Sequence, residues 1–280
     1  MAVEFSATPA YGVGMKQRVM GWLRWVWAVA WLAGGTGESR LGAADAELKY
    51  EAPQYLTGAI YGQGADSKKL LYHFKRVATR SGSTLKVERT YTYPDGKPAA
   101  RERVVYEGDS LVSLELEELQ IGAAGSARVR RSAPNAAKGS IDFEYRAEPG
   151  GRTKTSSEAL KANTILGDMV GPFLASNWDA LARGDQVKCR YLVVPRRETV
   201  GFTFVKSGES TWQGKEVMLV KMEASSVLLA ALVDPLFFTM EKAAPHRVLQ
   251  HAGRTTPKLQ VGSKWKDLDA VTVFDWANAR

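Results

Sequence analysis

Hydrophobic and polar residues alternate along most of the chain beyond Tyr55. Large apolar or aromatic side chains alternate with other residues over 70–75 and recur in one phase at Leu85, Val87, Tyr91 and Tyr93, with charged or hydroxyl side chains between them, and residues 141–145 repeat the pattern. Successive side chains of a strand point to opposite faces, so this period predicts half-buried β-strands. Further strands are expected at 187–194, 199–205, 216–224, 236–241, 246–252 and 271–276.

Turn sequences separate these segments. Pro94-Asp95-Gly96 and Gly108-Asp109 both suit tight hairpin turns. Residues 122–139 are rich in Ala, Gly and Ser and are expected to form a long flexible hairpin loop. The chain therefore predicts a meander of antiparallel strands.

Helical spacing is confined mainly to residues 163–183, which we expect to begin at a cap on Asn163 or Thr164 and to be broken at Gly171-Pro172. A second short helix is expected from Asn177 to Gly184, and residues 225–233 fit either a helical turn or a short strand. Roughly a dozen strands are expected. The predicted fold is mainly β: a single large antiparallel, strongly curved sheet or open barrel, capped by two or three short helices, in one domain over residues 45–280.

The first 44 residues differ from the rest. Lys16, Arg18 and Arg24 precede a nine-residue apolar run, and small residues follow as far as Ala44. The run is too short to span a bilayer and is typical of a secretory signal peptide, with an uncleaved anchor as the alternative. Met15 is a candidate for the true initiator. The sequence thus predicts a periplasmic or secreted protein.

The net charge of the chain and its expected export indicate which partners it would meet. The full chain has a net charge of +8, and removal of residues 1–44 leaves a net charge of +6. A cationic exported protein meets anionic membrane surfaces rather than nucleic acid. The basic cluster Arg128, Arg130 and Arg131 is interpreted as a solvated edge.

Ser110 stands in the sequence Gly-Asp-Ser-Leu, which opens the nucleophile block of one class of lipases and esterases. The residues after Ser110 alternate as a strand, whereas that class needs a strand-to-helix corner. None of the three histidines follows an Asp at the required spacing of three residues, so no base can be assigned. We therefore interpret Ser110 as part of a hairpin and expect no catalytic residue.

No other residue is a stronger candidate for a catalytic or metal-binding role. His246 and His251 are five residues apart, which cannot form a local metal site, and we expect them on the surface. Cys189 falls on the apolar side of its strand, as an inert core thiol would. Glu115 and Glu117 point outward, and a β-bulge is invoked to explain why Glu118 breaks the alternation. No metal or cofactor is expected.

Two segments carry a resemblance: GPFLASNWDALARG and VDPLFFTMEKAAPHRVLQHAGR. Over about residues 50–276 the chain resembles uncharacterised exported bacterial β-sheet proteins. More distantly it is similar to the lipoprotein-carrier half-barrels, in which a curved sheet wraps an apolar cavity closed by helices. The resemblance implies the possibility of such a cavity and no functional residue.

The leading hypothesis is a non-catalytic envelope protein that binds a lipid or acyl chain inside the curved sheet. The helical segment is expected to form a lid through Met169, Val170, Phe173 and Leu174. The expected cavity walls are Phe202, Phe204 and Phe238. The same side chains would equally fill a dry core. The alternative is a structural module that docks another envelope protein, and a hydrolase using Ser110 is third.

Overall fold

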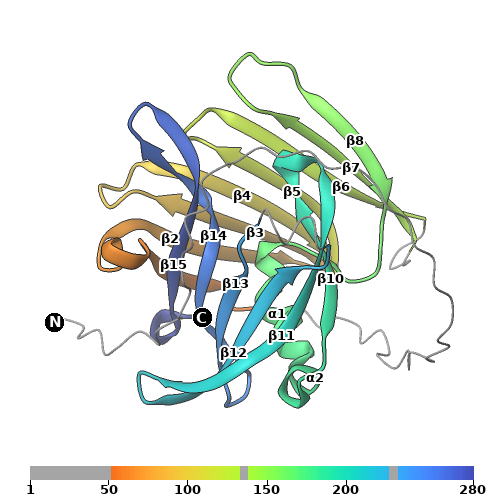
Figure 1. Cartoon of the computed structure of the whole chain (residues 1–280). Helices are drawn as coiled ribbons and strands as arrows, with labels where there is room; N and C mark the ends of the chain where they lie inside the picture. The colour runs from red at the N-terminus through yellow and green to blue at the C-terminus, as the bar shows by residue number, and fades with distance from the viewer. Residues whose placement is uncertain (1–51, 133–137, 227–232) are drawn as a thin grey trace, which may run out of the picture. The chain divides into compact units, whose positions relative to one another are not determined.

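Strands make up most of the part of the chain that the structure describes. The computed structural model describes residues 52–132, 138–226 and 233–280 (Figure 1). The expected leader, and most of the ambiguous segment 225–233, lie outside these residues. The strands are β1 (Tyr55–Tyr61), β2 (Leu70–Ser81), β3 (Thr84–Thr92), β4 (Pro98–Glu107), β5 (Ser110–Glu118), β6 (Ala123–Arg131), β7 (Gly139–Arg146), β8 (Lys154–Ala159), β9 (Thr164–Ile165), β10 (Val187–Val193), β11 (Glu198–Trp212), β12 (Lys215–Ala224), β13 (Leu236–Glu241), β14 (Val248–Val261) and β15 (Lys264–Asp275).

Helical segments are few and short. The α-helices are α1 (Val170–Ser176) and α2 (Trp178–Arg183), and the single 3-10 turns are η1 (Gly64–Asp66), η2 (Gly167–Met169), η3 (Val194–Arg196) and η4 (Trp276–Asn278). No helix in the described ranges is long and apolar enough to cross a membrane.

All fifteen described strands belong to one sheet, in the order β8-β7-β6-β5-β4-β3-β2-β1-β15-β14-β13-β12-β11-β10-β9. The first strand pairs with the last, as in Thr57 opposite Asp275, so two meanders meet at the β1–β15 ladder. Every ladder is antiparallel except the short parallel pairing of β9 with β10. The predicted fold class, a large mainly antiparallel sheet with short helices, is confirmed.

The connection between β8 and β9 requires the sheet to curl. These strands are the two edges of the sheet, yet only residues 160–163 separate them in the chain. Laid flat, fifteen strands would be about 67 Å wide, whereas five peptide steps reach at most about 18 Å. The edge strand β8 accordingly lies close to the start of β11, near the other end of the sheet: the Ser156 hydroxyl donates to the Arg197 carbonyl, and the Thr199 amide donates to Glu158 Oε1 at 2.9 Å. The sheet is strongly curved but not closed by a ladder.

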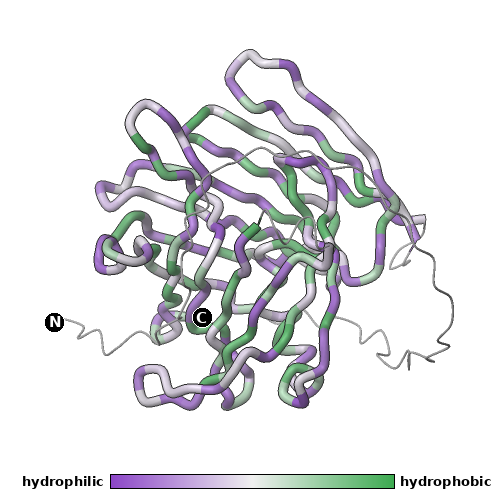
Figure 2. Tube along the Cα trace, viewed as in Figure 1, coloured by the Kyte–Doolittle hydropathy of each residue, from purple (hydrophilic) through white to green (hydrophobic). Residues whose placement is uncertain are grey.

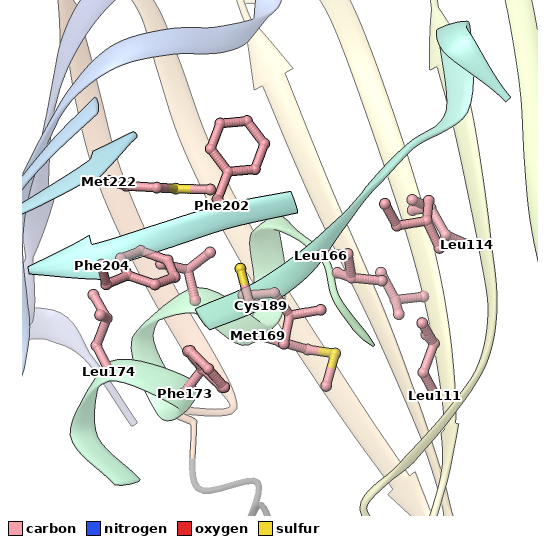
Figure 3. Close-up of a cluster of buried hydrophobic side chains, with 14 of the residues drawn as sticks. Leu111, Leu114, Leu166, Met169, Phe173, Leu174, Cys189, Phe202, Phe204 and Met222 are labelled. Carbon is pink, nitrogen blue, oxygen red and sulfur yellow. The ribbon is translucent and has the colours of Figure 1, made fainter. Parts of the chain in front are cut away.

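The alternation read from the sequence is visible along the strands, where apolar and polar positions follow each other residue by residue (Figure 2). The inward residues of β3–β7 pack with α1 and with β10–β13 in one large core. A smaller core lies where β1–β4 meet β15, and includes Ile60, Phe74 and Leu268. Figure 3 shows part of the large core, with Leu111 and Leu114 of β5 opposite the β10–β11 side.

The hairpin interpretation of Ser110 is confirmed. Glu107 pairs with Ser110 across the turn, and Gly108 has φ +57°, a left-handed conformation that glycine adopts without a steric penalty. Ser110 is therefore the first residue of β5 and does not stand at a strand-to-helix corner.

The prediction that residues 122–139 form a flexible loop is wrong. Ala123–Arg131 form β6, paired with β5 and β7, and only residues 133–137 of that segment lie outside the described part. Small residues here meet a packing requirement, because a Cβ on Gly125 would lie 2.4 Å from the Glu144 carbonyl and 2.8 Å from Val194 Cγ1. Arg128 and Arg130 are exposed as expected, but β6 is an interior strand and not an edge.

The prediction that a helix begins at a cap on Asn163 or Thr164 is also wrong. Thr164–Ile165 form β9, η2 follows, and α1 begins at Val170. Gly171-Pro172 lies in the first turn of α1, where proline interrupts no intrahelical hydrogen bond, so it does not break the helix. The second helix ends as predicted, with Gly184 in a left-handed C-terminal conformation.

Three expected strands are longer than predicted. β11 continues to Trp212, β14 to Val261, and β15 begins at Lys264. The β14–β15 extension carries charges on both strands, and these pair across the ladder: Arg254 with Asp269 and Lys258 with Asp267. Cross-strand ion pairs support a strand without apolar alternation, which is why the pattern missed it.

Candidate functional site

A cavity of about 1130 Å³ lies within the curved sheet. It follows β14 from Val248 past His251 to Lys258 and is also lined from β2–β5, β10–β13 and α1. We call the end near the β13–β14 turn (residues 242–247) the turn end, and the end near Lys258 the hairpin end. Exposed lining residues occur at both, Pro245 at the turn end and Asp267, which pairs with Lys258, at the hairpin end, so the cavity reaches solvent at each.

One wall of the cavity is apolar. Its residues come from β5, β10, β11, β12 and β13 and are all buried: Leu114, Leu116, Leu192, Val200, Phe202, Met222 and Phe238. Phe202 and Met222 lie near each other, while Phe204 lies farther along β11, closer to Leu174 (Figure 3). This wall suits a hydrocarbon chain, which binds by removing apolar surface from water.

Four charged residues on the adjacent strands β2, β3, β4 and β5 also line the cavity. Each occupies a position at which the buried residues of its strand recur, so its side chain points inward. Arg76 follows Tyr72 and Phe74, and Arg89 lies between Val87 and Tyr91. Glu102 precedes Val104, and Glu118 follows Leu114 and Leu116. The sequence contained this signal, because a charge in the apolar phase of an alternating strand is predicted to point inward. These four residues were not among the predicted site residues.

The prediction that Glu118 breaks the alternation of its strand is wrong. Its exposed fraction is 3%, in phase with Leu116, so it does not break the alternation. The register shift of β5 lies earlier, beside Val105 of β4, and it puts Leu111 rather than Val112 inward. Glu118 receives a hydrogen bond from Tyr145 Oη at 2.5 Å and pairs with Lys258 at 3.0 Å.

Asp168 is the centre of the most buried polar group. Arg76 donates to it from Nε at 2.7 Å and from Nη2 at 3.2 Å, and Tyr106 Oη donates at 3.0 Å. The Arg76 guanidinium also donates to the carbonyl of Pro53. A two-pronged Arg–carboxylate contact fixes orientation as well as charge, so this group fastens η2, at the start of α1, to β2 and β4.

Arg89 lies beside this group and faces the cavity. Its guanidinium is 2.5 Å from Glu102 and 4.0 Å from Asp168, and it lies over the rings of Phe74 and Tyr91. Burial opposes its charge, but Glu102 and the other negative groups outweigh burial and raise the pKa of Arg89. Nη1 of Arg89 and Oη of Tyr191 both approach Gly167, where a Cβ would lie 2.7 and 3.1 Å from them. Burial raises the pKa of Tyr191 to about 12.

The charges at the hairpin end form a connected network. Lys258 pairs with Glu118 and Asp267 at 3.0 Å each, and Arg254 pairs with Asp267 at 2.6 Å and Asp269 at 2.9 Å. Gln120 joins this end to β2, since its amide nitrogen donates to Tyr72 Oη at 2.9 Å while its oxygen accepts from the Lys258 amide at 2.7 Å.

The prediction that His246 and His251 are surface residues is wrong. Both line the cavity: His246 stacks on Trp178 with ring centroids 3.8 Å apart, and His251 stacks on Phe238 at 5.0 Å. Burial, and then the nearby Arg89, lowers the pKa of His251 to about 4. Nδ1 of His246 and Nε2 of His251 are buried atoms that have no hydrogen-bond partner among the described residues. Five residues apart, the histidines share the cavity because a register shift lies between Thr239 and Met240, where β13 pairs with β14.

The seven hypothesised ligand-binding residues divide into two groups. Val170, Phe202 and Phe238 line the cavity. Met169, Phe173, Leu174 and Phe204 are buried in the large core instead, with the Phe173 and Phe204 rings 5.8 Å apart. The α1 residues that line the cavity beside Val170 are Gly171, Pro172 and Ala175.

Cys189 is a core residue, as predicted. Its exposed fraction is 5%, and burial raises the pKa of its thiol to about 12. In the part of the chain that the structure describes, no group of three or more His, Cys, Asp or Glu side chains is placed to hold a metal ion. No protein-family model, curated protein or solved structure matches the chain.

Proposed function

We propose that this protein binds an amphiphilic ligand, a lipid or another molecule with an acyl chain, in the cavity of the curved sheet, without catalysis. The observation that supports the proposal is that one cavity is lined both by buried apolar side chains, mainly from β10–β13, and by charged side chains from β2–β5 and β14. A hydrocarbon chain would lie along Phe202, Met222 and Phe238, and its polar end would meet charged or hydrogen-bonding groups.

The proposal includes export. Residues 1–44 have the basic, apolar and small-residue zones of a signal peptide, so we place the protein in the periplasm or outside the cell. There it would meet lipid, anionic membrane surfaces and other envelope proteins. The lipoprotein-carrier half-barrels that the chain distantly resembles are consistent with this proposal.

Titration with a fluorescent fatty-acid probe tests the binding. We expect saturable binding, and native mass spectrometry of protein purified from its host is expected to detect bound lipid. Val200→Trp should lower the affinity at least about tenfold, because the indole would occupy cavity volume beside Phe202.

Val77→Trp is the matched control, since Val77 is exposed and does not line the cavity. Its affinity should equal that of the parent protein. Circular dichroism of both variants shows whether the β-sheet is retained. Absence of saturable binding by the parent protein, together with no lipid by native mass spectrometry, would favour the alternative in which the protein docks another envelope protein.

A further inference from the structure

The balance of charges differs between the two ends of the cavity. At the hairpin end, Lys258 and Arg254 are paired with Glu118, Asp267 and Asp269. In the middle, Arg76 is paired with Asp168, and Arg89 with Glu102. Cations that already have carboxylate partners gain little from a further anion, because the local field is largely cancelled.

Arg247 at the turn end is different. It lines the cavity, and its guanidinium lies 5.3 Å from the centroid of the Trp276 ring. Among the residues that the structure describes, no carboxylate oxygen lies within 4.0 Å of it. Two acidic residues in the flanking elements have other partners: Glu241 pairs with Lys215 at 2.8 Å, and Asp275 accepts from Asn278 at 2.6 Å.

His246 adds a hydrogen-bonding group at the same end. It precedes Arg247 in the chain and lines the cavity, and its Nδ1 has no partner among the described residues. A buried polar atom without a partner costs free energy that a ligand atom can recover. Within the described part of the chain, the pair thus combines a guanidinium without a carboxylate partner and an imidazole nitrogen without a hydrogen bond.

Two tryptophans hold this pair in place. Trp178 of α2 stacks on His246 with an interplanar angle of 2°, and Trp276 of η4 lies under Arg247 while its Nε1 donates to the Val248 carbonyl at 2.8 Å. The backbone is fixed as well, because the Glu241 amide donates to the Arg247 carbonyl at 2.9 Å. A guanidinium held over an indole loses little further freedom when it binds an anion.

We propose that Arg247, with His246, binds the anionic headgroup of the ligand, a carboxylate or phosphate, at the turn end of the cavity. The acyl chain then runs inward past Val248 to Phe238 and Phe202. Guanidinium recognises both anions through paired N–H donors, and the adjoining apolar wall selects an anion that carries a hydrocarbon chain over a free one. This inference rests on the proposed function of the cavity.

The test compares a fatty acid with the fatty alcohol of the same chain length as competitors of the fluorescent probe. The parent protein should prefer the acid about tenfold or more, because a hydrogen bond to a charged group is lost with the alcohol. Arg247→Gln should remove most of that preference and leave the affinity for the alcohol within about twofold. Arg128→Gln, which removes the same charge from an exposed residue outside the cavity, should keep the preference.

Three results would overturn the inference while the proposed function stands. The first two are equal binding of acid and alcohol by the parent protein, and an unchanged preference for the acid in Arg247→Gln. The third is loss of that preference in Lys258→Gln, which would place the headgroup at the hairpin end. Binding of inorganic phosphate alone as tightly as the fatty acid would also overturn it, since the site would then serve a free anion. If neither acid nor alcohol displaces the probe and the probe itself does not bind saturably, both the inference and the proposed function fail.

Discussion

At the scale of single residues, the informative feature is four charged side chains in the apolar phase of their strands. Arg76, Arg89, Glu102 and Glu118 would each be expensive to bury alone. Each has an ionic partner in the structure, so the cost is offset while the cavity gains a polar wall. A solid core would be served better by apolar residues at these positions, and this favours a binding role.

His251 should make stability depend on pH. Its pKa is about 4 in the folded protein and about 6.5 when unfolded, so between these values the unfolded chain binds more protons. This contribution to stability is fully present above pH 6.5 and is lost as pH falls to 4, by up to about 3 kcal/mol.

Urea unfolding at pH 4.5, 5.5 and 7.0 measures this effect, with His251→Gln as the comparison. The variant should lose less stability than the parent protein over the same interval. Parallel pH dependences of the two proteins would mean that His251 titrates normally.

Ser110 is expected to be chemically idle, because it begins a strand at a two-residue hairpin turn. Ser110→Ala should retain any esterase activity that a purified preparation shows, measured with a short-chain ester under identical conditions. A loss of a hundredfold or more with an unchanged β-sheet spectrum would contradict the hairpin interpretation.

At the scale of elements, the Asp168 group attaches the helical segment to the sheet. Arg76 comes from β2, Tyr106 from β4 and Asp168 from η2, just before α1. The lid hypothesis therefore changes in detail: α1 contributes Val170, Gly171, Pro172 and Ala175 to the cavity, while its Phe173 and Leu174 anchor it in the core.

Arg76→Met should destabilise the protein by about 3 kcal/mol, because it leaves a buried carboxylate without its main partner. We expect the lower end of the usual range, since Arg89 remains 4.0 Å from Asp168. Denaturant unfolding measures the loss.

The double variant Arg76→Met/Asp168→Asn removes both charges and keeps an acceptor for Tyr106. It should recover part of the lost stability. If it is less stable than Arg76→Met alone, the carboxylate is not the source of the destabilisation.

At the scale of the whole described part, one short connection shapes the cavity. Residues 160–163 join the two edge strands, so the sheet must curl around its concave face. The core side chains and α1 do not fill that face completely, and the cavity remains. Access from both ends suits a long ligand better than a small compact one.

Export should remove the first part of the chain. We expect intact-mass analysis of protein from the soluble envelope fraction to show cleavage near Ala44, because small residues follow the apolar run there. Replacement of Trp25 and Trp27 by Asp should block export and leave an uncleaved species in the cell. A soluble envelope species that still begins at Met1 or Met15 would contradict the prediction.

The sequence by itself determined the elements whose causes are local. Alternation placed most strands, Gly108 and Gly96 marked hairpin turns, and Gly184 marked the end of α2, because strand period and left-handed backbone depend on neighbouring residues. It misjudged β6, where composition resembled a loop but Gly125 has to be small to pack against Glu144 and Val194.

Only the tertiary structure decided the site, because its contacts join residues far apart in the chain. Arg76 and Asp168 are 92 positions apart, and Gln120 and Lys258 are 138 apart. The period of a strand indicates that a charge points inward, but not which partner neutralises it. The curl of the sheet brings those partners together, and among the residues that the structure describes it leaves Arg247 over Trp276 without a carboxylate partner.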